Sequence, residues 1–327
     1  MVEKRKRTRG AGARRPRDDE ARWALAVHGG AGTVPKAGLD ADEEAAVRAA
    51  LTAALQAGAR ALAGGAASLD VVEQAVCALE DSPLFNAGKG AVFNARGEHE
   101  LEASIMDGRT LKAGAVANLR GIRNPVTLAR WVMERTPHVY LAGEGAIAFA
   151  QSEGMELIAP DYFWTEQSWG ALKRERLRAG RERRSLEHGT VGAVALDSQG
   201  NLAAATSTGG ITNKLAGRVG DSSVIGAGTY ASNESCAVSC TGQGEYFMRA
   251  AAARDICALV EYGERSARAA AAMVIREKIA RLGGHGGVIV VDRRGGVFSV
   301  FNTGVMYFGK VTHDTRAATA IHAHEHD

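Results

Sequence analysis

Short apolar runs bounded by glycine alternate along the chain with longer segments in which apolar residues recur every four positions. Residues 23–27 form an apolar run that leads into the glycine-rich residues 28–32, which predicts a buried strand followed by a glycine turn. The four-residue spacing then predicts a helix that begins at the acidic residues 42–44 and ends near Gly64-Gly65. Ser68 is a suitable cap for a second helix.

Three segments have the pattern of β-hairpins. The first spans residues 103–116 and turns at Asp107-Gly108, while the others span residues 190–206 and 287–301. Each of the last two turns at an aspartate that is followed by a glycine three residues later. Alanine-rich helices are predicted between these two hairpins. Strands and helices therefore come in blocks, which favours antiparallel sheets covered by helices over alternating βαβ units.

Composition and charge restrict the possible domain organisation and partners only slightly. The chain has 327 residues, of which 46% are hydrophobic, enough for one large domain or two ordinary ones. The formal net charge is +3, and most of the excess lies in residues 4–17. No aromatic residue is interleaved with these charges, so residues 1–22 are predicted to be a disordered basic tail and nucleic-acid binding is not favoured. A second basic segment, residues 173–184, is either a charged helix or a linker and marks a possible boundary.

The cysteines and the apolar segments indicate the compartment. Cys236 and Cys240 do not have the two-residue gap of common zinc or redox pairs, and the four cysteines are expected to be small core residues in a reducing environment. No apolar segment has the length that a bilayer requires, and the basic N-terminus lacks the apolar part of a secretory signal. A cytoplasmic enzyme or binding protein is therefore expected.

Two glycine-rich segments imitate nucleotide-binding motifs. Residues 226–231 fit the letters of a dinucleotide fingerprint, but polar residues follow where its helix should start. Residues 86–90 resemble a phosphate loop only loosely, because neither Ser nor Thr follows Lys89. Neither segment is expected to bind a nucleotide.

Thr190 follows Gly189 at the start of an apolar strand and is a candidate nucleophile. A threonine hydroxyl is a poor nucleophile that needs a base within hydrogen-bonding reach. A chain-terminal threonine carries such a base itself, because an α-amino group has a pKa of about 8 and is partly neutral near pH 7. Only cleavage of the Gly189–Thr190 bond would free that amine. On spacing alone, the favoured interpretation is that Thr190 is an ordinary first residue of a strand.

A resemblance to a known family favours the interpretation of Thr190 as a nucleophile over that of an ordinary strand residue. The chain resembles the plant-type asparaginases, or isoaspartyl aminopeptidases, which belong to the N-terminal-nucleophile hydrolases. The resemblance extends from about Trp23 to Phe308, and its motifs occur in the family's order. They are HGGAG at residues 28–32, SPLFNAGKGAVF at 82–93, GTVGAVALD at 189–197, ATSTGG at 205–210, GRVGDS at 217–222, GAGTYA at 226–231 and SCTGQGE at 239–245.

The resemblance implies an α+β fold, a four-layer αββα sandwich of two antiparallel sheets flanked by helices. Residues 23–327 would form one domain that cleaves itself before Thr190 into an α chain, 1–189, and a β chain, 190–327, with a linker at about 165–189. Two such αβ units would pair. Thr190 would attack the side-chain carbonyl of L-asparagine or of a β-aspartyl dipeptide, forming a β-aspartyl ester that water hydrolyses.

The resemblance also assigns roles to residues around Thr190. A second threonine would support the nucleophile, a guanidinium would hold the substrate α-carboxylate, and a carboxylate would hold the α-ammonium group. Two residues would face the developing oxyanion, and a glycine would lie in the substrate loop. In this order, the residues are Thr208, Arg218, Asp221, Thr241, Gly242 and Gly244.

A loop before residue 90 resembles the family's sodium-binding loop, in which backbone carbonyl oxygens surround a hard monovalent cation. The ion would be structural, and no cofactor is expected for the chemistry. The carbonyls would be those of Leu79, Glu80, Ser82, Phe85, Ala87 and Lys89.

Two alternatives stay open within the same fold. One is a glycosylasparaginase, which needs room for a sugar on the leaving-group side. The other is an uncleaved, inactive relative that binds small amino acids or a partner.

Overall fold

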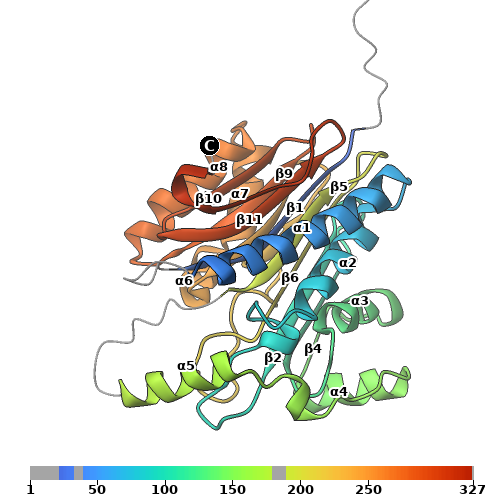
Figure 1. The fold of residues 1–327 in the computed structure, drawn as a ribbon. Helices are drawn as coiled ribbons and strands as arrows, with labels where there is room; N and C mark the ends of the chain where they lie inside the picture. The colour runs from blue at the N-terminus through green and yellow to red at the C-terminus, as the bar shows by residue number, and fades with distance from the viewer. Residues whose placement is uncertain (1–21, 33–39, 179–188, 326–327) are drawn as a thin grey trace, which may run out of the picture.

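The computed structural model describes residues 22–32, 40–178 and 189–325 and forms two stacked sheets with helices on both outer faces (Figure 1). The larger sheet has eight strands in the order β12-β11-β1-β5-β6-β2-β3-β4, and all its neighbours are antiparallel except β3 and β4. Its strands are β1 Ala24–Gly32, β2 Leu101–Asp107, β3 Ala113–Leu119, β4 Tyr140–Ala142, β5 Val191–Leu196, β6 Leu202–Thr208, β11 Val305–Thr312 and β12 Ala318–His322.

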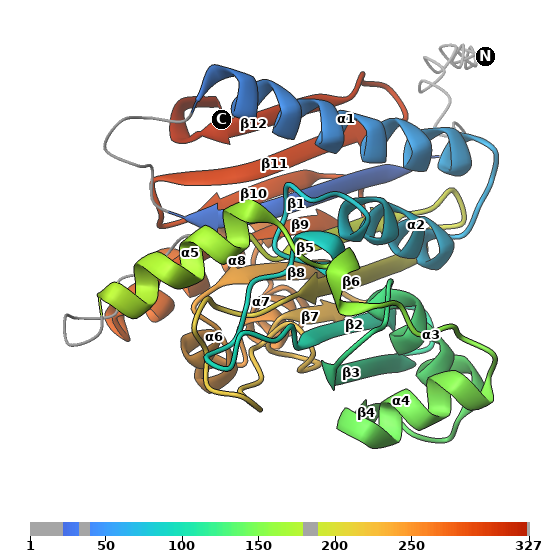
Figure 2. The same ribbon diagram turned by 60° about the horizontal axis from the view of Figure 1, so that its bottom comes forward.

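The smaller sheet has four antiparallel strands in the order β10-β9-β8-β7. They are β7 Thr229–Ala231, β8 Cys236–Gly242, β9 Gly286–Asp292 and β10 Val297–Phe301. Figure 2 shows this sheet behind the larger one, with the two central strands β5 and β6 between the helices of one side and the smaller sheet.

The helices divide between the two outer faces. Helices α1, α2 and α3 cover the larger sheet, and α7 and α8 cover the smaller one (Figure 2). The helices are α1 Ala41–Ala63, α2 Ser68–Glu80, α3 Pro125–Arg135, α4 Gly143–Ser152, α5 Glu166–Leu177, α6 Gly244–Ala250, α7 Ala252–Glu261, α8 Ala267–Ala272 and the π-helical segment η3 Met273–Ile279, with short 3-10 turns η1 Gly88–Gly90, η2 Pro160–Tyr162 and η4 Ala323–Glu325. No helix among these combines the length and apolar character needed to cross a bilayer.

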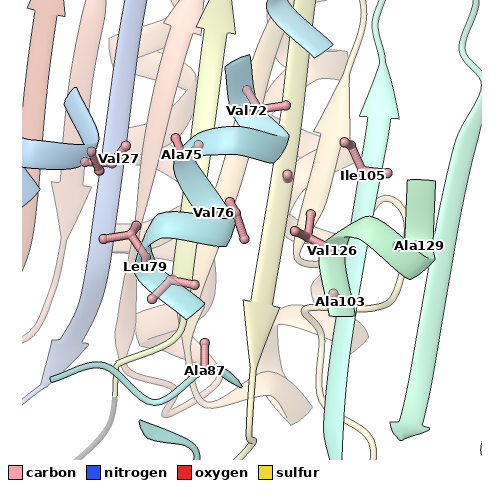
Figure 3. Close-up of a cluster of buried hydrophobic side chains, with 14 of the residues drawn as sticks. Val27, Val72, Ala75, Val76, Leu79, Ala87, Ala103, Ile105, Val126 and Ala129 are labelled. Atoms are coloured by element: carbon pink, nitrogen blue, oxygen red, sulfur yellow. The ribbon is translucent and has the colours of Figure 1, made fainter. Parts of the chain in front are cut away.

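Three apolar clusters lie between the four layers. Figure 3 shows the first, in which Val72, Val76 and Leu79 of α2 point toward the larger sheet. The second fills the space between the two sheets, and the third lies between the smaller sheet and its helices. Because side chains alternate along each strand, every strand of the sandwich core contributes to two clusters. The predicted αββα sandwich is confirmed.

The three predicted hairpins are confirmed, and the last two turn in the same way. Asp197 Oδ1 accepts hydrogen bonds from the backbone N–H groups of residues 199 and 201, and Asp292 Oδ1 does the same for residues 294 and 296. The glycine three residues after each aspartate has positive φ, +84° at Gly200 and +81° at Gly295. A side-chain-stabilised turn of this kind is a local property, so the sequence pattern could predict it.

Two local predictions were wrong. Residues 28–32 do not form a turn but continue β1, because they pair with β11, with a shift of register between His28 and Gly30. Ser68 does not cap α2 but is its first residue, and its backbone N–H donates to Asp197 Oδ2 at 3.0 Å. In both cases a distant segment supplies the hydrogen-bond partner.

The segments around the second basic stretch and the N-terminal tail are described only in part. Helix α5, residues 166–177, includes the first part of this stretch, residues 173–177, which is therefore helical; residues 179–188 lie outside the described residues. The predicted tail also lies outside them, except for Arg22. The first alanine-rich helix is broken at Ala251, which has φ of +49° and separates α6 from α7.

Candidate active site

One end of the layer between the two sheets is polar. Along five strands the inward-facing residues change from apolar to polar toward this end. The polar inner residues are His28 of β1, Glu102 and Ser104 of β2, Thr190 at the start of β5, Thr206 and Thr208 of β6, and Ser239 and Thr241 of β8. Most of the predicted site residues lie at this end or in the loops that follow it.

Thr190 and Thr208 form a hydrogen-bonded pair. Val191 of β5 pairs with Ser207 of β6, so the next positions, Thr190 and Thr208, lie side by side on the inner face. The Thr190 hydroxyl donates to Thr208 Oγ1 at 3.2 Å, and both residues are less than a tenth exposed. Thr208 Oγ1 also accepts the backbone N–H of Gly210 at 3.0 Å, which fixes its orientation. The structure therefore brings the two predicted threonines together.

Gly189 lies in very close contact with β1. A Cβ atom on Gly30 would come within 1.9 Å of the Gly189 Cα, and a Cβ atom on Gly189 would come within 1.9 Å of the Gly29 carbonyl oxygen. Only glycine fits at either position. The first two glycines of the HGGAG motif and the first residue of the GTVGAVALD motif are thus two sides of one contact, which holds the Gly189–Thr190 bond against β1.

Asn86 is a residue at this bond that sequence reasoning missed. Its backbone N–H donates to the Gly189 carbonyl oxygen at 3.0 Å. Its side chain donates to the Gly210 carbonyl oxygen at 2.6 Å and accepts from the Val92 N–H at 3.0 Å. The Gly189 carbonyl is therefore polarised by a fixed donor. The motif SPLFNAGKGAVF contains this residue, but nothing local in it indicates the contact.

A cavity of about 300 Å³ opens beside Gly189. Its walls come from the glycines of β1, from Phe85 and Asn86, and from Thr165 and the start of α5. The cavity therefore lies next to the carbonyl side of the Gly189–Thr190 bond.

Thr241 and Gly242 lie at the end of β8, on the other sheet. Thr241 is buried, and its Oγ1 accepts the backbone N–H of Ala31 at 3.3 Å, which joins β8 to the HGGAG run. Gly242 has φ of +147°, and a Cβ atom there would come within 2.4 Å of the His285 carbonyl oxygen. Glycine is therefore required at this position.

Arg218, Asp221 and Gly244 are in contact and are called here the clamp. A Cβ atom on Gly244 would come within 2.8 Å of Asp221 Oδ1 and 3.1 Å of Arg218 Nη2, so the absence of a side chain leaves the space between them open. Arg218 Nε donates to Glu245 Oε1 at 3.0 Å. Asp221 Oδ2 is buried and has no hydrogen-bond partner among the described residues. Burial, and then the nearby charge of Glu102, raise the pKa of Asp221 to about 7.

Glu102 is a second residue that the sequence did not indicate. It pairs with Thr208 across β2 and β6, and its carboxylate accepts the Gly220 N–H at 3.0 Å and the Ser223 hydroxyl at 2.9 Å. Arg218 Nη1 lies 3.9 Å from Glu102 Oε1. Glu102 thus connects the threonine pair to the clamp.

A chain of buried hydrogen bonds crosses between the sheets behind the threonine pair. His28 Nε2 contacts Ser239 Oγ at 2.8 Å, and Ser239 Oγ contacts Thr206 Oγ1 at 2.7 Å. The chain continues through Thr229 to Ser104, whose hydroxyl donates to the Ser222 carbonyl oxygen at 2.6 Å. Burial lowers the pKa of His28 to about 3, so the imidazole is neutral at physiological pH. These bonds fix the two sheets relative to each other.

The loop after α2 packs backbone carbonyl oxygens closely against two of its glycines. A Cβ atom on Gly88 would come within 2.4 Å of the Glu80 carbonyl oxygen, and one on Gly90 within 2.1 Å of the Phe85 carbonyl oxygen. The carbonyls of Phe85 and Ala87 each accept one backbone N–H, and a carbonyl oxygen has a second lone pair for a cation. The Leu79 carbonyl accepts from the backbone N–H groups of residues 81 and 82. The donor chemistry fits a sodium ion. Within residues 22–32, 40–178 and 189–325, no three His, Cys, Asp or Glu side chains are grouped to hold a metal.

The αββα sandwich, with a Gly-Thr bond at the head of a central strand, has the architecture of the N-terminal-nucleophile hydrolases. Comparison with known families then identifies the particular family. Residues 21–321 match the family model described as Asparaginase, and the chain belongs to this family.

Relatives from distant organisms are similar over most of their length. An Escherichia coli protein named isoaspartyl peptidase is 52% identical over 296 residues, which cover 86% of this chain and 91% of the relative. An Arabidopsis thaliana protein named probable isoaspartyl peptidase/L-asparaginase 2 is 40% identical over 91% of this chain and 98% of its own. A human isoaspartyl peptidase/L-asparaginase is 44% identical over 83% of this chain and 87% of the human protein.

Proposed function

We propose that the protein is an amidohydrolase that cleaves itself between Gly189 and Thr190 and then hydrolyses L-asparagine and β-aspartyl dipeptides. The observation that carries the proposal is the hydrogen bond of 3.2 Å between Thr190 and Thr208, directly beside a Gly189 carbonyl that is held by Asn86 N–H. Membership of the asparaginase family and the names of the relatives give the substrate class.

The first reaction is an acyl shift within the chain. The Thr190 hydroxyl attacks the Gly189 carbonyl carbon, and the C–N bond between the residues breaks while the hydroxyl proton passes to the departing nitrogen. The N–H of Asn86 points at the oxygen that becomes negative, where a fixed donor stabilises the transition state. Water then hydrolyses the ester, which leaves a carboxylate on Gly189 and a free amine on Thr190.

The second reaction uses that amine as the base. The amine accepts the Thr190 hydroxyl proton while the oxygen attacks the side-chain carbonyl of the substrate. Ammonia, or the amino group of the second residue of a dipeptide, leaves with a proton, and a β-aspartyl ester of Thr190 remains. Water hydrolyses this ester to L-aspartate and restores the threonine. Thr208 orients the hydroxyl, and Thr241 with the N–H of Gly242 would stabilise the oxyanion.

The clamp would hold the rest of the substrate. The guanidinium of Arg218 binds the α-carboxylate, and Asp221 Oδ2, which is buried without a partner among the described residues, binds the α-ammonium group. Gly244 leaves room for the substrate between them. Binding both α-groups presents the side-chain carbonyl to Thr190.

The decisive experiment starts with a denaturing gel of the purified protein and N-terminal sequencing of the smaller fragment. A fragment that begins TVGAVALD is expected, and Thr190→Ala should stay uncut. Release of ammonia from asparagine and of the second amino acid from β-aspartyl dipeptides is then measured. A chain that stays whole on long incubation would refute the mechanism and favour the binding protein, and faster turnover of glycosylated asparagine would favour the glycosylasparaginase.

We further propose that the carbonyl oxygens of residues 79–89 hold a structural sodium ion. The proposal is supported by the oxygen-only donor chemistry of the loop, in which the carbonyl oxygens of Glu80 and Phe85 pack against the backbone of Gly88 and Gly90. The ion would fix the loop that carries Asn86. The melting temperature should therefore rise with sodium chloride and not with choline chloride at equal ionic strength. Equal effects of the two salts would contradict the site.

The cytoplasmic location and the pairing of two αβ units stay predictions. Light scattering of the purified protein at several concentrations tests the pairing.

A further inference from the structure

Glu102 is a buried carboxylate in the layer between the sheets, only 1% exposed. Such a group is costly to bury unless hydrogen bonds satisfy it. Here both of its oxygens accept from the Gly220 N–H, and one also accepts from the Ser223 hydroxyl. All of these donors belong to the loop that carries the clamp. The carboxylate is thus committed to this loop and not to the core around it.

The position of Glu102 relates the clamp to the proposed nucleophile. Glu102 lies opposite Thr208 in the sheet, and Thr208 lies beside Thr190 on the next strand. Neighbouring strands are about 4.8 Å apart, so two strand spacings, roughly 10 Å, separate the row positions of Glu102 and Thr190. On its other side Glu102 contacts the loop between Arg218 and Ser223.

We propose that Glu102 is the positioning residue of the clamp and that its negative charge makes the site select substrates with a free α-ammonium group. The proposal rests on the proposed function, because it concerns the same substrate. It assigns no contact between Glu102 and the substrate: Glu102 acts through Gly220, Arg218 and Asp221.

The positioning part follows from the hydrogen bonds. Gly220 lies between Arg218 and Asp221, so fixing its N–H fixes the backbone that presents both side chains. Glu100, two residues before Glu102, accepts the Gly217 N–H with its two carboxylate oxygens at 3.2 and 3.1 Å. Two carboxylates at alternate positions therefore fasten two glycines of the loop, one before and one after Arg218.

The selection part follows from the charges. The carboxylates of Glu102, Asp221 and Glu245 surround the guanidinium of Arg218. Even with the nearby ammonium of Lys214, negative groups outnumber positive ones in this cluster. The α-ammonium and α-carboxylate groups of an amino acid together add no net charge, whereas the same molecule without its amino group brings one more uncompensated negative charge. The cluster should therefore reject the second kind of molecule.

The pH dependence gives a readout that a merely structural role would not change. The charged and titratable groups around Asp221 are Glu102 on β2, Arg218 in its own loop, Glu245 on α6 and Cys240 on β8. Glu102 raises the pKa of Asp221. Removing its charge should lower that pKa, so the acid limb of kcat/KM for asparagine should move to lower pH.

The test compares Glu102→Gln with the wild-type protein and with the matched control Glu98→Gln. Glu98 lies four residues away and is 40% exposed beside Arg120, so the control removes the same charge from the surface. Calorimetry measures binding of L-aspartate and of succinate, which is aspartate without its ammonium group. For Glu102→Gln we expect Kd for L-aspartate to rise about tenfold while that for succinate stays within about twofold or falls. Glu98→Gln should change neither value.

Turnover separates binding from chemistry. In Glu102→Gln, KM for asparagine should rise about tenfold while kcat stays within about threefold, because the threonine pair is intact. Equal weakening of L-aspartate and succinate, or an unmoved acid limb, would overturn the selection. Unchanged KM and Kd would overturn the whole proposal.

Ser223→Ala keeps the test decisive if Glu102→Gln fails to fold or to be cut. This variant removes one hydrogen bond to Glu102 but leaves its charge. Binding of both ligands should weaken by the same factor with no shift of the acid limb, and no weakening would refute the positioning role.

A wild-type protein that binds L-aspartate but hydrolyses nothing would refute the proposed function alone. Active wild type with an indistinguishable Glu102→Gln would refute only the role of Glu102.

Discussion

Replacing Gly30 by alanine tests the contact on which the proposed self-cleavage depends. The added methyl group would lie 1.9 Å from the Gly189 Cα, whereas ordinary contacts begin at 3.4 Å. The two backbone segments would therefore have to separate by roughly 1.5 Å. Gly30 also has φ of +117°, which L-residues rarely adopt.

The expected effect has two parts. The backbone conformation alone costs about 1–3 kcal/mol of stability in a residue with a side chain. The displacement of Gly189 moves its carbonyl relative to both the Thr190 hydroxyl and the Asn86 N–H, and a misplacement of about 1 Å costs on the order of 100-fold in rate. Cleavage of Gly30→Ala should therefore be slower by about 100-fold or more.

Cleavage is followed by denaturing gel over time, and stability is followed by urea unfolding of uncut protein in a Thr190→Ala background. Gly65→Ala is the matched control, because Gly65 also has positive φ, +85°, but no atom lies within 4 Å of its added Cβ. It should lose a similar conformational energy and be cut at the normal rate. If Gly30→Ala is cut as fast as Gly65→Ala, the close contact does not position the bond and the reasoning is wrong.

Four further predictions concern the threonine pair, the clamp and the hydrogen bonds between the sheets. Thr208→Ala removes the acceptor of the Thr190 hydroxyl and should slow asparagine turnover by about 10–100-fold, whereas Thr208→Ser should restore most of the rate; similar rates in both variants would contradict the pairing. The pKa of Asp221 is raised to about 7, and its carboxylate form binds the ammonium group, so its ionisation should make kcat/KM for asparagine rise with pH through about 7. This rise should be missing in Asp221→Asn, whereas the rise due to the Thr190 amine, with its pKa of about 8, should remain. The same raised pKa means that Asp221 stabilises the fold below its unfolded pKa of about 4 and loses this contribution as pH rises from there through about 7, so Asp221→Asn should flatten the fall in stability between about pH 4 and 7. Ser239→Ala leaves the buried Nε2 of His28 without its partner and should lower the free energy of unfolding by about 1–3 kcal/mol in urea, whereas the exposed Ser152→Ala should change it by less than about 0.5 kcal/mol.

Local chemistry determined the elements that the sequence predicted correctly. The turns at Asp197 and Asp292 depend on residues within four positions of each aspartate, and the helix α1 is set by its own apolar spacing and acidic start. The wrong predictions concern segments whose structure depends on residues far away in the sequence. The strand β1 extends through its glycines because residues 305–308 pair with them, and the start of α2 is capped by Asp197, 129 residues away. The local sequence pattern does not indicate which distant residues will pair with such a segment.

The candidate site shows the same division. The sequence, through its resemblance to a family, named Thr190, Thr208 and the clamp, and the alternation along five strands even contains the change from apolar to polar inner residues. It could not indicate Asn86 or Glu102, because their roles come from hydrogen bonds to the backbone of Gly189 and Gly220. The latter contact joins residues 118 positions apart. Every residue offers the same N–H and C=O groups, so only the packing of distant segments decides which of them meet.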